Sequence, residues 1–317
     1  MAATASPARE RVPLKNRQPI SRTTIHGWPS VIFGLPFAGI GTFFFLMGLG
    51  KVEVDPAKVH APLWIISVFG LMFLLAGLSF IWHGMDGLRR KTRIKNVKTT
   101  RAASPWLWDY EWQALGISDN KLKKVLHGFI MLVVVGTFLA PFHWWAFVSD
   151  EGHLMVKLMV IFFELVFGLG GGYYFLNNLA LYLKYGNSRL RFANFPFYLG
   201  DKLSVILVGL PSEINQLQLD LRFVEEKYET RQRGNKKESR VVCYQLFHEA
   251  RTLKGREVAP SGKLSLEWDL PDEPEFTSNL SQRPARFWEL EVKADTPGVD
   301  YHSRFLLPVY SKSRPGA

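Results

Sequence analysis

The sequence has few of the residues that catalytic and metal sites are built from. Its 317 residues include a single cysteine, Cys243. One thiol excludes an intrachain disulfide and a cysteine-based metal cluster, as is usual for a domain in a reducing compartment. The second half also lacks a nucleophile elbow and any metal-ligand spacing of histidines and carboxylates. We therefore predict no catalytic residues, no metal ligands and no cofactor, and we expect Cys243 to pack in a strand as a small buried side chain.

Charge is nearly missing from four long stretches of the first 185 residues. These stretches are 31–50, 63–82, 129–147 and 158–183. A bilayer core of about 30 Å needs about 20 mostly apolar residues in one helix. The sequence therefore predicts four transmembrane helices, which form two antiparallel hairpins because the loops inside each pair are short.

The charges that flank these stretches predict their orientation. Loops rich in Lys and Arg stay in the cytoplasm, whereas acidic residues count for little. The basic residues gather before the first stretch and between the second and third: Arg9, Arg11, Lys15, Arg17, Arg22, Arg89, Arg90, Lys91, Arg93, Lys95, Lys98, Arg101, Lys121, Lys123 and Lys124. The loops after the first and third stretches have no such excess. We therefore expect both termini to be cytoplasmic.

The net charge of +11 does not predict a nucleic-acid-binding protein. Much of the excess flanks the apolar stretches, where topology and anionic lipid headgroups explain it. From Lys184 onward there are 21 basic and 18 acidic residues, a balance of +3, and no recognisable DNA- or RNA-binding motif. We expect membrane lipids as partners at the basic loops, and no nucleic acid.

The pattern changes from helical to alternating after the fourth stretch. Seven segments resemble half-buried strands and are separated mostly by turn residues: 190–195, 203–208, 217–223, 241–247, 264–268, 287–292 and 301–307. This number of short strands predicts an all-β sandwich. The charged segment 225–240 has the composition of a solvated hairpin tip.

The predicted organisation is therefore an α-helical membrane domain followed by a β-sandwich. Residues 1–28 are expected to be a disordered basic tail, because Ala, Pro, Arg and Thr dominate them without periodicity. Residues 29–185 form the transmembrane domain, which includes an interfacial Trp-rich segment at 104–117. Residues 186–311 form the cytoplasmic sandwich, and 312–317 form a tail.

Several motifs together resemble a known family. These are Pro105-Trp-Leu-Trp-x-x-x-Trp112 followed by Gly116-Ile117, Gly186-Asn-Ser188 leading into Phe197-Tyr-Leu-Gly200, and the ending from Trp288 to Tyr301 followed by Phe305 and Pro308-Val309. The chain resembles a family of bacterial inner-membrane proteins of unknown function, and the ending is also similar to an arrestin-type sandwich. The resemblance implies a fold and an inner-membrane location. It implies no activity, because the family brings no established catalytic residues.

Glu164 is the sharpest polar candidate in the predicted membrane helices. An ionised carboxylate there is costly, so a functional role is one reading, in which Glu164 is a proton or cation site. The other reading is a protonated side chain that is hydrogen-bonded to a neighbouring helix, for example at Thr137 or Thr42. Asn177 and Asn178 are weaker candidates of the same kind. The nearby glycines of 168–172 are best explained by close helix packing rather than by phosphate binding.

The Trp-rich segment is the second candidate site. Three Trp and one Tyr within seven residues suit a headgroup-level anchor, because their rings have an apolar body and a polar tip. Asp109 and Glu111 lie between the rings, and a simple anchor does not require them. We therefore keep Trp106, Trp108, Asp109, Glu111 and Trp112 as candidate interfacial or partner-binding residues.

These observations favour a non-enzymatic inner-membrane protein whose cytoplasmic sandwich binds a protein partner or supports a membrane complex, since sandwiches usually act through edges and end loops. The alternative is a small oligomeric transporter or channel-like protein that uses Glu164. An enzymatic role has no positive support in the sequence.

Overall fold

The structure is a computed structural model, which describes residues 11–15, 17–20, 27–53, 62–148, 153–211, 213–233, 236–255 and 262–312. The chain divides into two compact units. The helical unit comprises residues 24–92 and 122–180. The β unit comprises residues 1–23, 93–121 and 181–317.

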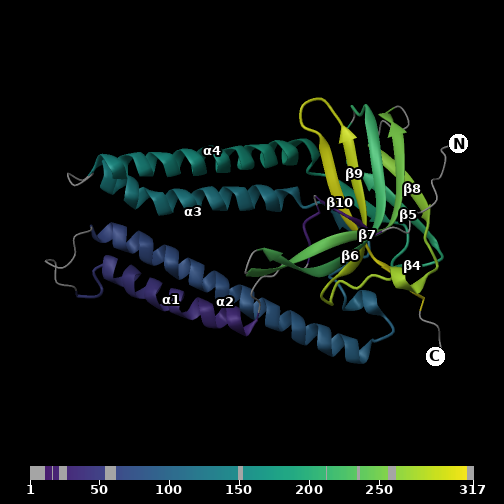
Figure 1. Cartoon of the computed structure of the whole chain (residues 1–317), viewed down its shortest axis with the longest axis horizontal. Helices are drawn as coiled ribbons and strands as arrows, with labels where there is room; N and C mark the ends of the chain where they lie inside the picture. Colours follow the sequence, from purple (N-terminus) through teal and green to yellow (C-terminus); the bar gives the residue numbers. More distant parts are fainter. Residues whose placement is uncertain are drawn as a thin grey trace. The chain divides into compact units, whose positions relative to one another are not determined.

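Four helices are long and apolar enough to cross a membrane, as predicted (Figure 1). They are α1 (Trp28–Gly48), α2 (Leu63–Thr100), α3 (Lys121–Phe147) and α4 (Leu154–Tyr185). Helix α2 continues well beyond the apolar stretch, which ends at Trp82. From Leu88 to Lys98, seven of the eleven residues are Leu, Lys or Arg, which are good helix formers, so helical propensity supports the element after the hydropathy signal stops.

Helices α1 and α2 are joined along a seam of glycines spaced seven residues apart. The seam consists of Gly34, Gly41 and Gly48 in α1 and of Gly70, Gly77 and Gly84 in α2. A Cβ atom at Gly34 would lie 2.7 Å from the Gly77 carbonyl oxygen, and one at Gly41 would collide with the Leu74 backbone. Since a seven-residue repeat keeps these positions on one face, the two backbones approach more closely than any side chain allows.

The glycines of α3 and α4 are used differently. A Cβ atom at Gly136, Gly168, Gly170 or Gly172 would meet nothing within 4 Å in the described chain. A Cβ atom at Gly171 would lie 2.9 Å from Cδ2 of Leu132. The predicted role of the 168–172 glycines in close packing therefore holds for Gly171 and is wrong for the other three within this chain.

The two hairpins meet through aromatic rings on α2 and α3. The Trp64 and Trp144 ring centroids lie 6.0 Å apart with their planes nearly perpendicular. Phe69 makes edge contacts with Phe138 and Phe142 at 6.0 and 5.8 Å. These edge-to-face pairs join the hairpins where α2 begins and α3 ends.

The β unit contains two sheets that share one hydrophobic core. The first sheet has the order β1-β7-β6-β9-β10, the second has the order β2-β3-β5-β8, and β11 pairs with β4. The strands are β1 (Val12–Pro13), β2 (Gly116–Ser118), β3 (Arg189–Phe192), β4 (Phe197–Tyr198), β5 (Lys202–Val208), β6 (Gln216–Arg233), β7 (Lys236–Lys254), β8 (Lys263–Asp269), β9 (Arg286–Asp295), β10 (Tyr301–Leu307) and β11 (Val309–Tyr310). All seven predicted strands are present.

The core confirms the sandwich, because both sheets contribute to it by strict alternation. Leu203, Val205 and Leu207 of β5 are fully buried, as are Leu219 and Leu221 of β6 on the other sheet. Alternate residues of a strand face opposite sides of its sheet, so these positions pack between the two layers. The predicted burial of Cys243 is also confirmed.

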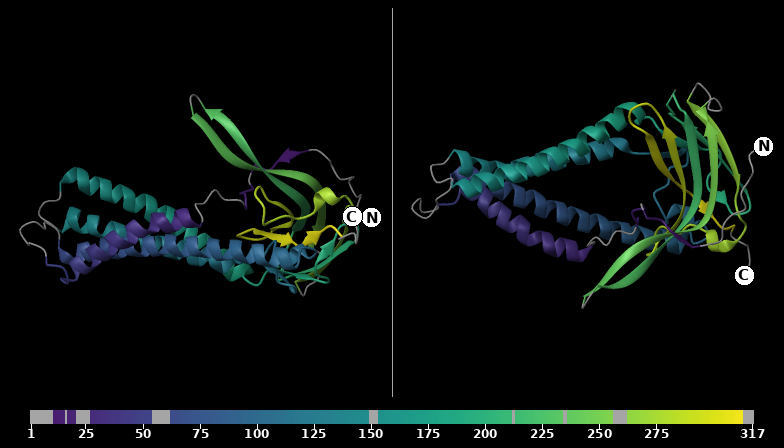
Figure 2. Two further views of the ribbon diagram at one scale, coloured as in Figure 1. Left: turned by 90° about the horizontal axis from the view of Figure 1, so that it is seen from below. Right: turned by 45° about the horizontal axis from the view of Figure 1, so that its top comes forward.

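The charged segment 225–240 is strand over most of its length. Pairing of β6 with β7 continues to the Arg233–Lys236 register, so the predicted hairpin tip is confined to residues outside the described ones. Figure 2 shows the two strands continuing as a ribbon beyond the sheet. The prediction of a solvated tip missed this ribbon because cross-strand pairing can hold charged residues in a strand when both faces are solvated.

The N-terminal segment 11–20 packs on the first sheet. Val12 and Pro13 pair with Gln245 and Tyr244 of β7, and the Leu14 amide donates to the Cys243 carbonyl. Leu14 and Ile20 pack against a small second core that includes Phe287. We call the described residues 11–15 and 17–20 the strap. The sequence analysis placed these residues in a disordered tail, whereas the structure pairs Val12 and Pro13 with β7 and packs Leu14 and Ile20 on the second core.

Candidate functional site

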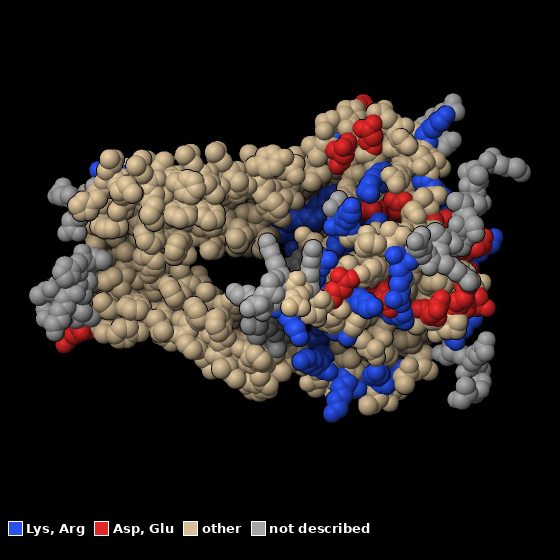
Figure 3. Space-filling model, viewed as in Figure 1, with Lys and Arg blue, Asp and Glu red and all other residues tan. Residues whose placement is uncertain are grey.

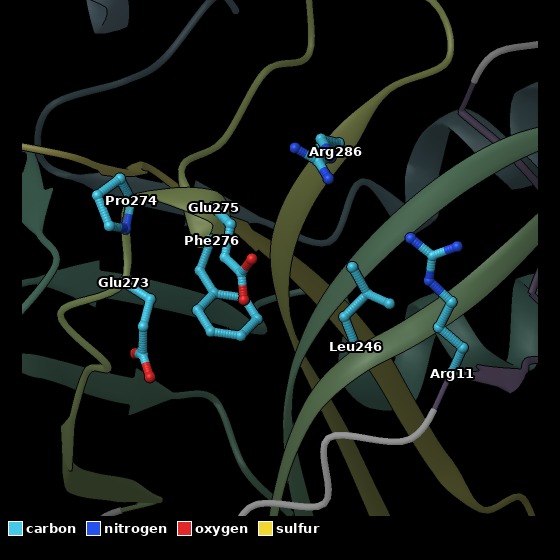
Figure 4. A pocket seen from close by; sticks show the side chains of 7 residues that line it. All are labelled: Arg11, Leu246, Glu273, Pro274, Glu275, Phe276 and Arg286. Carbon is cyan, nitrogen blue, oxygen red and sulfur yellow. The ribbon is translucent and has the colours of Figure 1, made fainter.

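The β unit carries a cleft of about 620 Å³ beside the strap (Figure 4). Arg11, Leu246, Glu273, Pro274, Glu275, Phe276 and Arg286 line it. Leu246 comes from β7, and Phe276 ends a short 3-10 helix, Pro274–Phe276. The cleft therefore has an apolar floor between an edge strand and a turn of helix.

Leu246 is placed by a β-bulge. Phe247 pairs with Phe223 and Gln245 pairs with Val224, which leaves Leu246 without a partner on β6. A bulge of this kind bends the strand and redirects a side chain. The described strap residues pair with β7 at Tyr244 and Gln245, so the bulge at Leu246 lies directly beside this pairing, where the cleft is.

Charges of both signs line the cleft at opposite ends, as Figure 4 shows. Arg11 and Arg286 both pair with Glu225, at 3.4 and 2.7 Å. Glu273 and Glu275 lie on the side of the 3-10 helix. Both arginines already share one carboxylate, so the attraction that the cleft offers to a further charge is that of Glu275, toward a basic group.

Arg17 of the strap completes a buried ionic cluster on β9. It contacts Glu289 at 2.8 Å, and Arg222 contacts the other oxygen of Glu289 at 2.9 Å. Glu289 is fully buried, so losing either arginine would leave a buried charge poorly compensated. The strap is thus held by charge as well as by strand pairing.

Glu291 in the same cluster has a strongly shifted acidity. Burial raises the pKa of Glu291, but hydrogen bonds from His302, Arg304 and Lys293 and the charge of Arg222 outweigh burial and hold this pKa well below its usual range. Cys243 shifts the other way, because burial raises its thiol pKa to about 11. A thiol that stays protonated is a poor nucleophile, so Cys243 is a packing residue.

The Trp-rich segment belongs to the β unit, and Asp109 is its buried anchor. Asp109 accepts hydrogen bonds from the Ser281 amide at 2.7 Å and from the Tyr310 hydroxyl at 3.1 Å. Trp112 donates its ring N–H to the Tyr310 hydroxyl at 2.8 Å. Burial and the neighbouring Asp109 raise the pKa of Tyr310 far above its usual value. These bonds satisfy polar groups in a protein interior and provide no catalytic group.

The other predicted residues of this segment lie around that anchor. The Trp106 ring packs edge-on against Tyr198 and also contacts Tyr310, with centroids 6.0 and 6.2 Å away. Lys98 lies over the Trp108 ring at 5.1 Å. Glu111 pairs with Arg93 at 3.0 Å, with a side chain that is 73% exposed. Glu111 is therefore open to the predicted partner contact, whereas Trp106, Asp109 and Trp112 serve the chain's own packing.

The helical unit brings Glu164 together with a histidine. The Glu164 Oε1 atom lies 2.7 Å from Nδ1 of His143 on α3. The partner is thus not Thr42 or Thr137, whose hydroxyls donate to the Ala38 and Val133 carbonyls of their own helices. In the view of Figure 3 the apolar lengths of the helices are almost free of charged side chains, whereas Lys and Arg gather at the C-terminal end of α2 and charges of both signs crowd the β unit.

The three predicted intramembrane polar residues do not form one site. Asn178 lies fourteen residues beyond Glu164, about 21 Å along α4, and donates to the Tyr174 carbonyl at 2.7 Å. Asn177 is exposed on another face. The sequence analysis missed His143 as the partner of Glu164. A symmetric register around the 148–153 loop would not have found it, because His143 lies four residues before the end of α3 and Glu164 ten residues after the start of α4.

No protein-family model matches the sequence, and no curated protein matches it. A solved structure with some similarity is that of Spo0M, a sporulation control protein from Bacillus subtilis. The identity is 11% and the TM-score 0.22, and the match covers 38% of this chain and 48% of that one. The chain thus spans about half the length of Spo0M. Four membrane-length helices and a β unit are compatible with a membrane protein that carries a β domain.

Proposed function

We propose that the protein is an inner-membrane adaptor whose β unit binds an extended, partly basic segment of a partner protein along the outer edge of β7. The helical unit is the anchor, with both termini in the cytoplasm. The basic residues that flank the helices support this orientation, and the resemblance to a bacterial inner-membrane family with an arrestin-type sandwich supports the location.

The observation that carries the proposal is the strap. Among the described residues, it adds Val12 and Pro13 to the edge of β7 by antiparallel pairing with Gln245 and Tyr244. An edge strand offers backbone donors and acceptors to any extended chain, so a partner segment can pair in the same way with the part of this edge that no described residue covers. The chain's own residues thus provide an example of the binding mode.

The cleft supplies the specificity that backbone pairing lacks. An apolar side chain of the partner fits between Leu246 and Phe276, since a cleft of about 620 Å³ exceeds the volume of one side chain. A Lys or Arg next to it approaches Glu273 and Glu275. The preferred ligand is therefore an extended peptide with an apolar residue beside a basic one.

The test is selection of peptides from a random library on the full chain held in lipid nanodiscs. Selected peptides are expected to pair an apolar residue with Lys or Arg and to bind less tightly, by about tenfold or more, to the Leu246→Asp variant. Ile206→Asp is the matched control, because Ile206 is an exposed apolar residue of β5 on the other sheet.

Equal loss of binding in both variants, or peptides that bind with no dependence on Leu246, would contradict the proposal. The orientation is tested separately by a reporter fused after Ala317, which is expected to read cytoplasmic. A reporter that is active only on the outer face would overturn the topology and leave the peptide result interpretable.

A further inference from the structure

A groove of about 380 Å³ lies on the helical unit between α3 and α4. Gly136, Ala140 and Gly168 create it, because their small side chains leave space that larger ones would fill. Trp144 and Phe167 contribute aromatic walls. His143 and Glu164 line the same groove, so the carboxylate–imidazole pair faces a cavity of ligand size.

The pair has a simple proton inventory. A 2.7 Å separation of Nδ1 and Oε1 needs a proton between the two atoms. With that proton alone the pair carries one negative charge, as neutral imidazole beside carboxylate. With one more proton the pair is neutral overall, either as imidazolium beside carboxylate or as imidazole beside carboxylic acid.

A bound monovalent cation can restore the same neutrality. We propose that this groove binds a small apolar organic cation, such as a quaternary or protonated amine, in exchange for one proton released from the His143–Glu164 pair. The cation's charge then faces the Glu164 carboxylate, and its apolar groups contact Trp144 and Phe167. Aromatic faces attract such cations in addition to the carboxylate. Total charge is conserved, since one positive charge enters as one proton leaves.

Few other groups disturb this exchange. Among the described residues, α1 and the 63–82 part of α2 carry no titratable side chain. On α4 the nearest is Lys157, seven residues or about 10 Å before Glu164, and His153 is farther along the same end. On α3 the next is His127, sixteen residues before His143. Among the described residues, His143 and Glu164 are thus the titratable side chains that line the groove.

The groove lies close to one end of the helices. His143 is four residues, about 6 Å, before the end of α3 at Phe147. The His143 and Glu164 side chains are 52% and 35% exposed. A cation and a proton therefore need to pass only this end of the helices, and not their apolar length, to reach the groove.

The experiment measures binding and proton release together, on the full chain in nanodiscs. The probe is benzyltrimethylammonium, and its neutral isostere neopentylbenzene is the matched ligand. Calorimetry in buffers of different ionisation enthalpy counts the protons. We expect about one proton released per cation bound, and an affinity that rises about tenfold per pH unit while the pair still holds its exchangeable proton. Neopentylbenzene is expected to release none.

Two glycines of α4 provide matched variants, one inside the groove and one outside it. Gly168 lines the groove and Gly170 does not, and a Cβ atom at either position meets nothing within 4 Å. We expect Gly168→Leu to abolish cation binding and Gly170→Leu to preserve it, while both proteins keep their fold. Glu164→Gln is expected to weaken the affinity for the cation at least tenfold and to abolish the proton release.

Three outcomes would overturn the inference. They are cation binding without proton release, equal affinity for the cation and its neutral isostere, and equal behaviour of the two leucine variants. If Glu164→Gln does not fold, the leucine pair still decides the matter, because neither leucine changes a charge. The peptide-binding proposal concerns the β unit and is unaffected by any of these results.

Discussion

The two helical hairpins use the same residue type for opposite purposes. In the α1/α2 hairpin, six glycines spaced by seven residues close the interface so tightly that a methyl group at Gly41 would strike the backbone of α2. In the α3/α4 hairpin, glycines at 136 and 168 leave a groove beside the His143–Glu164 pair. Glycine content alone therefore does not distinguish a sealed interface from an open one. Its spacing does, because only the regular spacing keeps glycines face to face.

The largest expected effect comes from filling the seam. Gly41→Leu should destabilise the protein by about 3 kcal/mol, since the side chain meets backbone that cannot move aside. Gly39→Leu is the matched control on the same helix, because a Cβ atom there meets nothing within 4 Å. Thermal unfolding in detergent measures both. Similar melting temperatures for the two variants would mean that the seam is not a tight interface.

Glu291 of the β unit, a carboxylate with several partners, is the reference for Glu164, which has one described partner. Because the pKa of Glu291 is depressed in the fold, its contribution is present above about pH 4.5, the ordinary value for Glu, and is lost as the pH falls through the folded-state pKa. We expect Glu291→Gln to cost about 2 kcal/mol at pH 7 and to flatten the acid dependence. Chemical unfolding from pH 7 to pH 3 tests this, and an unchanged slope would argue against it.

A smaller effect is expected at the open hairpin. Glu164→Gln should cost about 1 kcal/mol or less, because Glu164 has one described partner and a partly exposed side chain. A double-mutant cycle with His143→Ala measures the coupling at pH 7. A coupling as large as the Glu291 effect would show that the α3/α4 pair is a structural contact as strong as those of the β unit.

The smallest effect has the opposite sign. Gly168→Ala and Gly170→Ala should each stabilise α4 by about 0.5 kcal/mol, since alanine is the better helix former and both positions have room. Gly77→Ala should destabilise, because its Cβ would lie 2.8 Å from the Gly34 carbonyl oxygen. The unfolding midpoints of the three variants measure these changes in stability. If all three variants change stability in the same direction, the two hairpins do not differ in the way described.

The sequence was sufficient for the elements whose signal is local. Hydropathy located the four helices, and alternation located the seven strands, because both patterns repeat within a few residues. It did not locate the end of α2, where charged helix formers follow Trp82. It also missed the ribbon of β6 and β7, since those strands are held by each other rather than by an apolar face.

The candidate sites were less predictable because they depend on pairing between distant segments. Glu164 stood out by its cost in an apolar helix, but His143 became its partner only through the register of α3 against α4. Asp109 looked available between aromatic rings, whereas Tyr310 and Ser281 bury it. The strap could not be predicted for the same reason, because no local pattern within residues 11–20 indicates a contact with Glu289 or with the edge of β7.

The strap also has a consequence for the order in which the molecule is made. Arg17 and Glu289 are 272 residues apart, so at about 5 to 20 residues per second the ribosome adds the second about 14 to 55 s after the first. During that interval α1 to α4 emerge while the strap has no sheet to join. The strap is therefore fixed in place only after β7 and β9 have been translated, so docking of the strap reports that this sheet has formed.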